Sequence, residues 1–141
     1  MKLNQETDYA IRMVLLCREY SPQILSGAFI VEKCHAPDRW GKVILTSLTR
    51  NKILKSIKGK DGGFQLNKDA SKISLLDIVN IFEETAINAC VVDKNSCSYR
   101  QGLCIVCEKL TEVKGFLDKT LEGLTIEDLV IQQELKFGKN S

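Results

Sequence analysis

At 141 residues, the chain is long enough for one domain with at most a small dimerisation element. Apolar residues make up 44% of it and charged residues 27%, as in ordinary globular proteins. It has no apolar run of about 18 residues, so it is not expected to cross a membrane. Its start is polar and acidic, without the apolar stretch of a signal peptide, which predicts a cytoplasmic protein.

The net charge of +2 conceals an uneven distribution of charge. Residues 33 to 60 hold eight basic side chains against a single acidic one, Asp38, so this segment carries +7 and the remainder −5. A basic block on an otherwise acidic chain favours a local surface for a polyanion such as nucleic acid. A solvated basic face without a partner is the alternative interpretation.

The first fifty residues predict three helices. Apolar side chains recur at helical spacing over 7 to 20, and Ser21-Pro22 ends that helix because proline disfavours helical geometry in the residue before it. A short helix is predicted at 26 to 33, with Ser26 as its N-cap. After a break at 34–36, Pro37 suits the first turn of a helix running to about Arg50. This last helix is expected to bury four residues: Trp40, Val43, Ile44 and Leu48.

A β-hairpin is predicted directly after these helices. Alternating apolar residues at 53–57 and 64–66 flank the glycine-rich stretch 58–63, which is typical of a hairpin turn. Two short helices with a brief turn form a helix-turn-helix, and a hairpin that follows one is a wing. The glycines do not indicate a phosphate loop, because no Lys-Ser/Thr pair and no helix follow them.

The second half predicts two further helical regions around a loop. Ser74 and Asp77 have near capping-box spacing at the start of a helix over 74–85, and 86–102 loses periodicity. Apolar residues then recur at steps of three and four, interrupted only at Thr120; they are Leu103, Val106, Leu110, Val113, Leu117 and Leu124. Such a stripe predicts a seam between two chains, with packing on its own domain as the alternative. A short final helix is expected from Thr125.

The predicted fold is therefore mainly α with a small β-hairpin, a winged helix-turn-helix followed by a long dimerisation helix. Its expected parts are a DNA-binding domain at 1–85, a cysteine-bearing loop at 86–102, and the dimerisation and C-terminal helices at 103–135. The predicted partners are double-stranded DNA and a second copy of the chain.

The second helix of a helix-turn-helix enters the major groove with its first residues against base edges. These positions are Asp38, Arg39 and Lys42, of which Arg39 suits guanine and Asp38 suits the amino group of cytosine. The wing would carry Lys58 and Lys60 to the minor groove and phosphates. Three further basic residues are interpreted as phosphate contacts, which position the protein without reading sequence: Arg50, Lys52 and Lys55.

The sequence resembles the IscR/NsrR-type regulators in three places. These are the stretch Tyr9-Ala10-Ile11-Arg12, the wing from Ser56 to Leu66, and the helix at 74–83 followed by cysteines and a long helix. The resemblance covers about residues 3 to 130. It implies a winged-helix homodimer that binds a partly palindromic operator, usually as a repressor.

Six cysteines in a protein expected in a reducing compartment favour metal or redox chemistry over disulfides. Four of them lie within eighteen residues with C-x6-C-x6-C-x2-C spacing: Cys90, Cys97, Cys104 and Cys107. Thiolates suit iron–sulfur clusters, zinc or copper(I), and the wide spacing fits an iron–sulfur cluster better than a zinc ribbon. Reduced, unligated thiols are the alternative.

The resemblance assigns roles to these cysteines. It implies that Cys90, Cys97 and Cys104 hold a 2Fe–2S or 4Fe–4S cluster. The fourth ligand is either Cys107, at the position of a histidine in some relatives, or Asp8, which matches an acidic residue supplied by the partner's first helix in others. Of the remaining cysteines, Cys17 is expected in the core.

The turn holding Cys34 and His35 allows both side chains to be exposed, and His35 is interpreted as a surface residue rather than a ligand. The sequence contains no acid/base pair, nucleophile–histidine pairing or cofactor loop, so no enzymatic activity is expected. It predicts a transcription regulator that senses iron–sulfur, redox or nitric oxide status. The alternative is a cluster-free regulator of the same fold, switched by thiol oxidation or by a partner protein.

Overall fold

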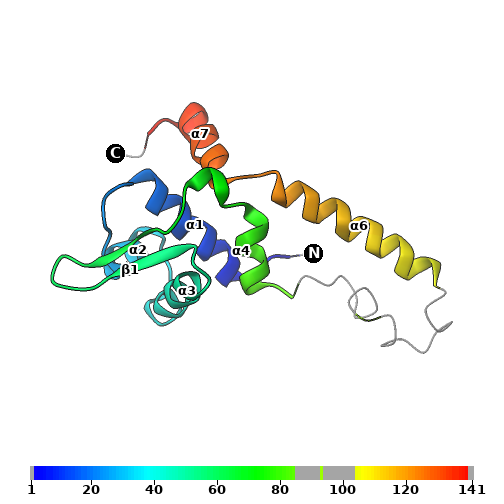
Figure 1. Ribbon diagram of the computed structural model, residues 1–141, viewed down its shortest axis with the longest axis horizontal. Helices are drawn as coiled ribbons and strands as arrows, with labels where there is room; N and C mark the ends of the chain where they lie inside the picture. The colour runs from blue at the N-terminus through cyan, green and yellow to red at the C-terminus, as the bar shows by residue number, and fades with distance from the viewer. Residues whose placement is uncertain (1, 85–92, 94–103, 140–141) are drawn as a thin grey trace.

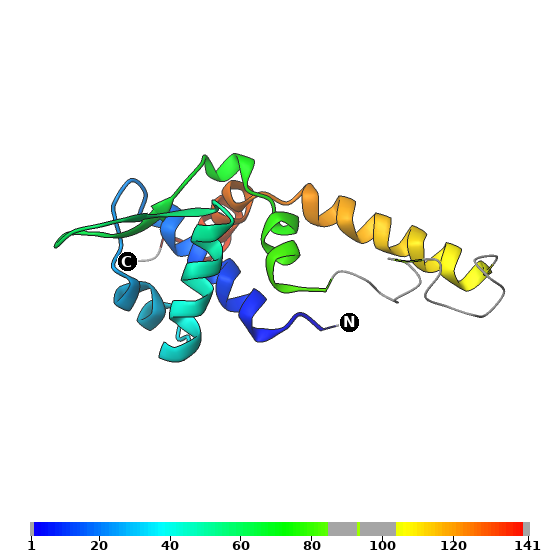
Figure 2. The same cartoon turned by 60° about the horizontal axis from the view of Figure 1, so that its bottom comes forward.

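The structure is a computed structural model that describes residues 2–84, 93 and 104–139. A body of helices carries a two-stranded hairpin at one end, and a long helix extends from it at the other (Figures 1 and 2). This confirms the predicted class, mainly α with one hairpin. The predicted loop at 86–102, with Cys90 and Cys97, lies outside the described residues except for Asp93. Among the described helices, none is long and apolar enough to cross a membrane.

Helix α1 spans Gln5–Glu19 and forms the centre of the body. It begins two residues earlier than predicted because Asn4 caps it, accepting a hydrogen bond from the backbone N–H of Thr7. It ends just before Ser21-Pro22, as predicted. Its inner face includes Met13, Val14 and Cys17, and all three are buried.

Helices α2 (Gly27–Lys33) and α3 (Asp38–Arg50) form the predicted helix-turn-helix. Ser26 caps α2 by accepting from the Phe29 N–H, as expected. The two helices approach closely at Gly41, where a Cβ atom would lie 2.4 Å from Cγ2 of Val31. Because real Cβ atoms do not tolerate such a distance, the crossing requires glycine at this position.

The prediction for the inner face of α3 was wrong at one residue. Ile44 and Leu48 are buried and Trp40 packs against the core, but Val43 is 58% exposed. At 100° per residue, Val43 lies about 100° from Ile44 around the helix, on the outer side. The inner place is taken by Leu45, which is buried.

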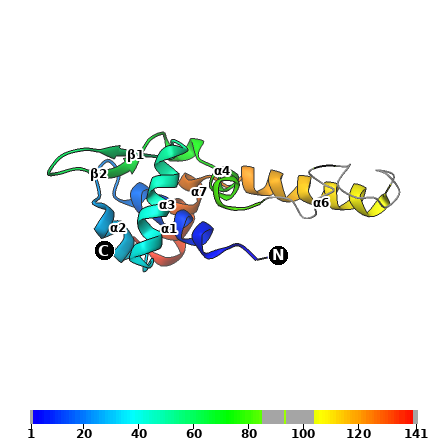
Figure 3. The same cartoon turned by 90° about the horizontal axis from the view of Figure 1, so that it is seen from below.

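Strands β1 (Leu54–Ile57) and β2 (Gly63–Leu66) pair antiparallel, with Leu54 opposite Leu66. The hairpin is fastened to the helix-turn-helix by a bridge between Leu25 and Phe64, whose backbones exchange hydrogen bonds of 2.7 and 3.0 Å. A Cβ on Gly63 would lie 2.1 Å from the Leu25 carbonyl oxygen, so this junction also needs glycine. The wing is thereby held in a fixed place beside α2 (Figure 3).

The rest of the chain surrounds α1. A short 3₁₀ helix η1 (Ala70–Lys72) leads to α4 (Leu75–Phe82), whose predicted capping box between Ser74 and Asp77 is present. Helix α6 (Ile105–Glu122) extends away from the body, and α7 (Ile126–Phe137) returns to pack against α1 (Figure 1). An antiparallel bridge joins Ser74 to Thr125, so the chain re-enters the body after α6 beside the start of α4.

Candidate DNA-binding surface and cysteine sites

The structure places every predicted DNA-contacting side chain at the surface of α3, of the hairpin or of the turn between them. Those on α3 lie along its outer side and those on the hairpin lie on β1 and its turn; all are exposed. They are Asp38, Arg39, Lys42, Arg50, Lys52, Lys55, Lys58 and Lys60. The structure therefore brings seven of the eight basic residues of the segment 33–60 to α3, the hairpin and the turn between them, where a winged helix contacts DNA, whereas Lys33 ends α2.

The start of α3 is arranged for contact with base edges. Asp38 is its first residue and Arg39 its second, and Lys42 follows one turn later. Asp38 and Lys42 also line a groove between α3, α2 and the hairpin, together with apolar side chains such as Phe64. Thr46 lines the same groove, and its hydroxyl donates to the Lys42 carbonyl at 2.8 Å.

The tip of the wing is a tight turn between Lys58 and Gly62. Gly59 adopts a φ of 114°, which L side chains rarely reach, and its carbonyl accepts a hydrogen bond from the Gly62 N–H. Lys58 and Lys60 flank this glycine and are exposed. The turn thus presents two ammonium groups at the outermost part of the hairpin.

Cys17 and Cys34 both belong to the hydrophobic core. Cys17 is buried as predicted, but Cys34 is buried too, although the turn would have allowed exposure. Desolvation raises the pKa of Cys17 to about 12 and that of Cys34 to about 11. Both therefore stay protonated near neutral pH. His35 is exposed in the turn, as interpreted from the sequence.

Two of the predicted cluster ligands, Cys104 and Cys107, lie at the start of α6. Cys104 is its N-cap residue, with extended backbone, and Cys107 follows three residues later; both are partly exposed. Cysteine sulfur is a soft ligand for iron and zinc, so these two side chains are candidates for metal ligation. Asp8, the other candidate for the fourth ligand, is exposed on α1 and pairs with Arg12 at 2.5 Å. No group of three potential metal ligands is assembled within the described part of the chain.

A hydrogen-bond network joins the start of α1 to the end of α4. The carboxylate of Glu83 accepts from the Asn4 N–H at 2.7 Å and from the hydroxyl of the fully buried Thr7 at 2.6 Å. The Asn4 side chain in turn donates to the Phe82 carbonyl. Sequence patterns do not reveal this network, because the partners of Glu83 are 76 or more residues away along the chain. It fixes α1, with Asp8 in its first turn, relative to the point where the chain departs toward residues 86–102.

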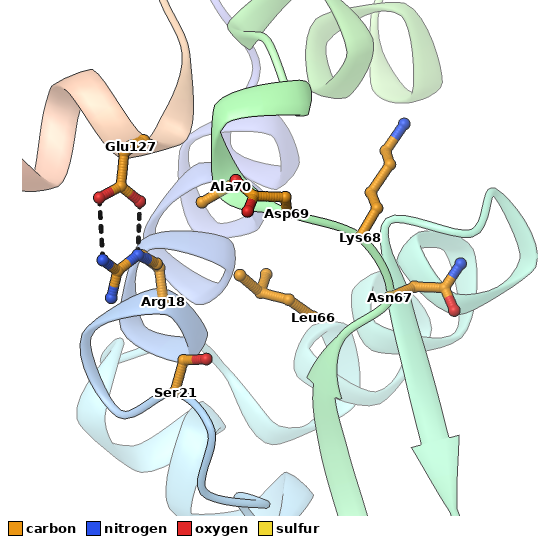
Figure 4. A pocket seen from close by; sticks show the side chains of 8 residues that line it. All are labelled: Arg18, Ser21, Leu66, Asn67, Lys68, Asp69, Ala70 and Glu127. Atoms are coloured by element: carbon orange, nitrogen blue, oxygen red, sulfur yellow. Dashed lines mark hydrogen bonds and ion pairs between the residues drawn. The ribbon is translucent and has the colours of Figure 1, made fainter.

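An ion pair joins the other end of α1 to α7. Nε and Nη2 of Arg18 donate to the two carboxylate oxygens of Glu127 at 2.5 and 2.8 Å, beside a pocket bordered by Asp69 and the end of the wing (Figure 4). These hydrogen bonds hold the pKa of the Glu127 carboxyl below its ordinary value. The pair ties the last helix to the DNA-binding body.

Helix α6 presents an apolar face that the rest of the described chain leaves open. None of its 18 residues is buried, although Leu110 and Leu117 are partly covered. Val113 is 53% exposed and Phe116 76% exposed, with Ile105 and Val106 similarly open. Leu103 of the predicted seam lies outside the described residues. Of the other predicted seam residues, Val106 and Val113 are exposed, and the leucines at 110, 117 and 124 are half-buried.

The helix-turn-helix, the attached wing and the exposed basic side chains together define a winged-helix, DNA-binding transcription regulator. Residues 3–132 match the Rrf2 family, described as iron-dependent transcriptional regulators, and the chain belongs to this family.

Known relatives share both sequence and fold with the chain. It is 28% identical over 137 residues to the HTH-type transcriptional regulator NsrR of Oceanobacillus iheyensis, covering 95% of this chain and 92% of the relative. Its fold is similar to that of T. potens IscR, with a TM-score of 0.80, 17% identity and coverage of 100% and 94% of the two chains. It is also similar to CymR, the global cysteine regulator of B. subtilis, with a TM-score of 0.72, 18% identity and coverage of 94% and 98%.

Proposed function

We propose that this Rrf2-family regulator is a homodimeric repressor whose DNA binding responds to iron–sulfur, redox or nitric oxide status. The observation that carries the proposal is the placement of Cys104 and Cys107 at the start of α6, the helix with the open apolar face. A ligand held there would act directly on the element that joins two copies. Half-sites must lie about 34 Å apart, so a small change at the seam alters simultaneous docking of both α3 helices.

The proposed ligand is an iron–sulfur cluster held by Cys90, Cys97 and Cys104, with Cys107 or Asp8 as the fourth ligand. The thiolate donor set suits such a cluster, and the cluster supplies sensitivity to oxidants, nitric oxide or loss of iron. The family description as iron-dependent and the similarity to NsrR and IscR support this assignment. Asp8 would reach the cluster of the second copy, since the resemblance places that ligand on the partner.

The proposed homodimer follows from the chemistry of α6. An extended helix that buries none of its residues gains little from its own domain, and isolated helices are marginal in water. Val113 and Phe116 lie three residues apart, so they occupy one side of the helix and form a seam when two copies pair.

Anaerobic purification followed by iron and sulfide assays and visible absorption spectroscopy tests the cluster. We expect iron, sulfide and a charge-transfer band, all lost when Cys90, Cys97 and Cys104 are replaced together by serine. Cys107→Ser and Asp8→Asn, made separately, identify the fourth ligand, because only the ligand's replacement changes the spectrum. Protein that contains neither iron nor sulfide would overturn the cluster proposal.

A cluster-free regulator of the same fold is the second candidate, favoured by the structural similarity to CymR. It predicts that the triple cysteine variant binds DNA and responds to the signal like the wild type. DNA affinity, measured by fluorescence anisotropy over a range of salt, tests both versions. Phosphate contacts impose a steep fall of affinity with salt, so a flat response would contradict DNA binding itself.

A further inference from the structure

Val43 stands apart from the other residues on the outer side of α3. It is 58% exposed, whereas the large apolar residues Ile44, Leu45 and Leu48 of the same helix are buried. Arg39 lies one turn before it. Its position is the sixth of the helix, within the part that enters the major groove.

The fold does not account for a valine at this position. Exposure leaves its methyl groups in water, so packing gains little, and valine has a lower helix propensity than the straight-chain polar residues. Single exposed apolar residues are common on protein surfaces, however, so exposure alone assigns no role. What distinguishes Val43 is the surface on which it lies.

That surface is the one proposed to read DNA. Arg39 and Lys42 precede Val43 on it, and Arg50 follows two turns later; all three are exposed. Thr46 lies on the next turn, and its hydroxyl hydrogen is engaged by the Lys42 carbonyl. Val43 therefore lies among cationic and hydrogen-bonding groups, on a helix whose outer side is otherwise polar.

Base edges in the major groove carry one apolar feature, the C5-methyl group of thymine, and side-chain methyl groups recognise it by apolar contact. Valine matches this feature well because its branched side chain is stiff and loses little freedom on binding. We propose that Val43 is a specificity-determining residue that contacts a thymine methyl group in each half-site of the operator. This inference rests on the proposed DNA-binding function and adds the base that α3 selects.

The test uses the full chain and an operator selected from a random DNA library. Each thymine of the half-site is replaced in turn by deoxyuridine, which keeps every hydrogen-bonding group and removes only the methyl. Affinities are measured by fluorescence anisotropy at one fixed salt concentration. For the wild type, we expect one thymine position at which the replacement weakens binding about fourfold per half-site, the equivalent of one buried methyl group.

The protein variants then show whether Val43 is responsible. With Val43→Ala, the same replacement should change affinity less than about twofold, whereas Val43→Ile should keep the full sensitivity. Neither variant should alter the slope of affinity against salt, because valine contacts no phosphate. Lys55→Ala, as the control, should reduce that slope by about two, one for each copy in the dimer. Thermal melting of the variants shows that each is folded.

Two results would overturn the inference in distinguishable ways. A Val43→Ala protein that retains the same sensitivity to deoxyuridine would show that another side chain reads the methyl. If deoxyuridine leaves the affinity of the wild type unchanged at every thymine position, the protein reads no thymine methyl group. Failure of the wild type to select or bind any DNA would instead contradict the proposed function.

Discussion

Gly41 on α3 lies directly against Val31 on α2, with room for a hydrogen but not for a methyl group between the two helices. The contact sets how closely the second helix of the helix-turn-helix packs on the first. It also explains why a glycine is present within α3, since glycine inside a helix normally costs up to about 1 kcal/mol relative to alanine.

Replacement of Gly41 by alanine should destabilise the protein. The added Cβ would lie 2.4 Å from Val31 Cγ2, and overpacking of this kind costs about 1–3 kcal/mol despite the better helix propensity of alanine. A Cβ added at Gly115, within α6, would meet no heavy atom within 4 Å, so Gly115→Ala is the matched control and should stabilise by about 0.5–1 kcal/mol. Urea denaturation measures both. Equal effects of the two variants would show that α2 and α3 do not approach as described.

Glu127→Gln should lower stability by about 0.5–1 kcal/mol near neutral pH, because the bidentate pair with Arg18 joins two separate helices. Since the folded-state pKa of Glu127 is lowered, its contribution is present above the ordinary glutamate pKa and is lost as the pH falls through the lowered value. The difference between wild type and variant should therefore shrink in acid. Chemical denaturation at several pH values measures it.

The exposed pair Lys109–Glu112 within α6 provides the comparison for this prediction. Its two partners lie on one helix surface, so Glu112→Gln should change stability by no more than about 0.5 kcal/mol. If Glu112→Gln lowers stability as much as Glu127→Gln does, the Arg18–Glu127 pair gains no extra stabilising effect from joining two separate helices.

Thr7→Val should destabilise the protein by about 1–3 kcal/mol, because it removes a buried hydroxyl that donates to the Glu83 carboxylate while keeping the shape of the side chain. Thr7→Ser keeps the donor and should retain much more of the stability. Thermal and urea unfolding measure the effect. If valine and serine behave alike, the hydrogen bond to Glu83 contributes nothing measurable.

Cys17 and Cys34 should resist alkylation in the folded protein. With pKa values of about 12 and 11, their reactive thiolate forms are scarce near neutral pH, and both side chains are buried. Treatment of metal-free protein with iodoacetamide, followed by peptide mass spectrometry, should label the partly exposed Cys104 and Cys107 much faster. The same reagent in urea should label all of them alike. Rapid labelling of Cys34 in the folded state would contradict its place in the core.

The sequence predicted the local elements well because their signals are local. Ser26 and the pair Ser74 and Asp77 cap helices through hydrogen bonds spanning three residues, which spacing alone reveals. The basic residues of α3 and the hairpin were likewise found at the surface.

The errors and omissions concern relationships between distant segments. Val43 and Leu45 are both apolar, so periodicity could not decide which of them faces the core; the crossing of α3 over α2 decides it. The burial of Cys34 likewise depends on the elements packed against its turn. The pair Arg18–Glu127 spans 109 residues, and no local pattern indicates such a contact. The assignment of Cys90, Cys97 and Cys104 to one ligand set, with Cys107 or Asp8 as the fourth ligand, stays a prediction.

The bridge between Ser74 and Thr125 has a consequence for how such a protein can diversify. Backbone hydrogen bonds of 2.8 Å join Leu75 to Leu124 and Ile126 to Ile73, so the two ends of the intervening segment are fastened together within the body. We therefore expect that insertions, deletions or a different ligand set between α4 and α6 leave this closure intact. Such variants should keep the stability of the DNA-reading body while changing what the protein responds to.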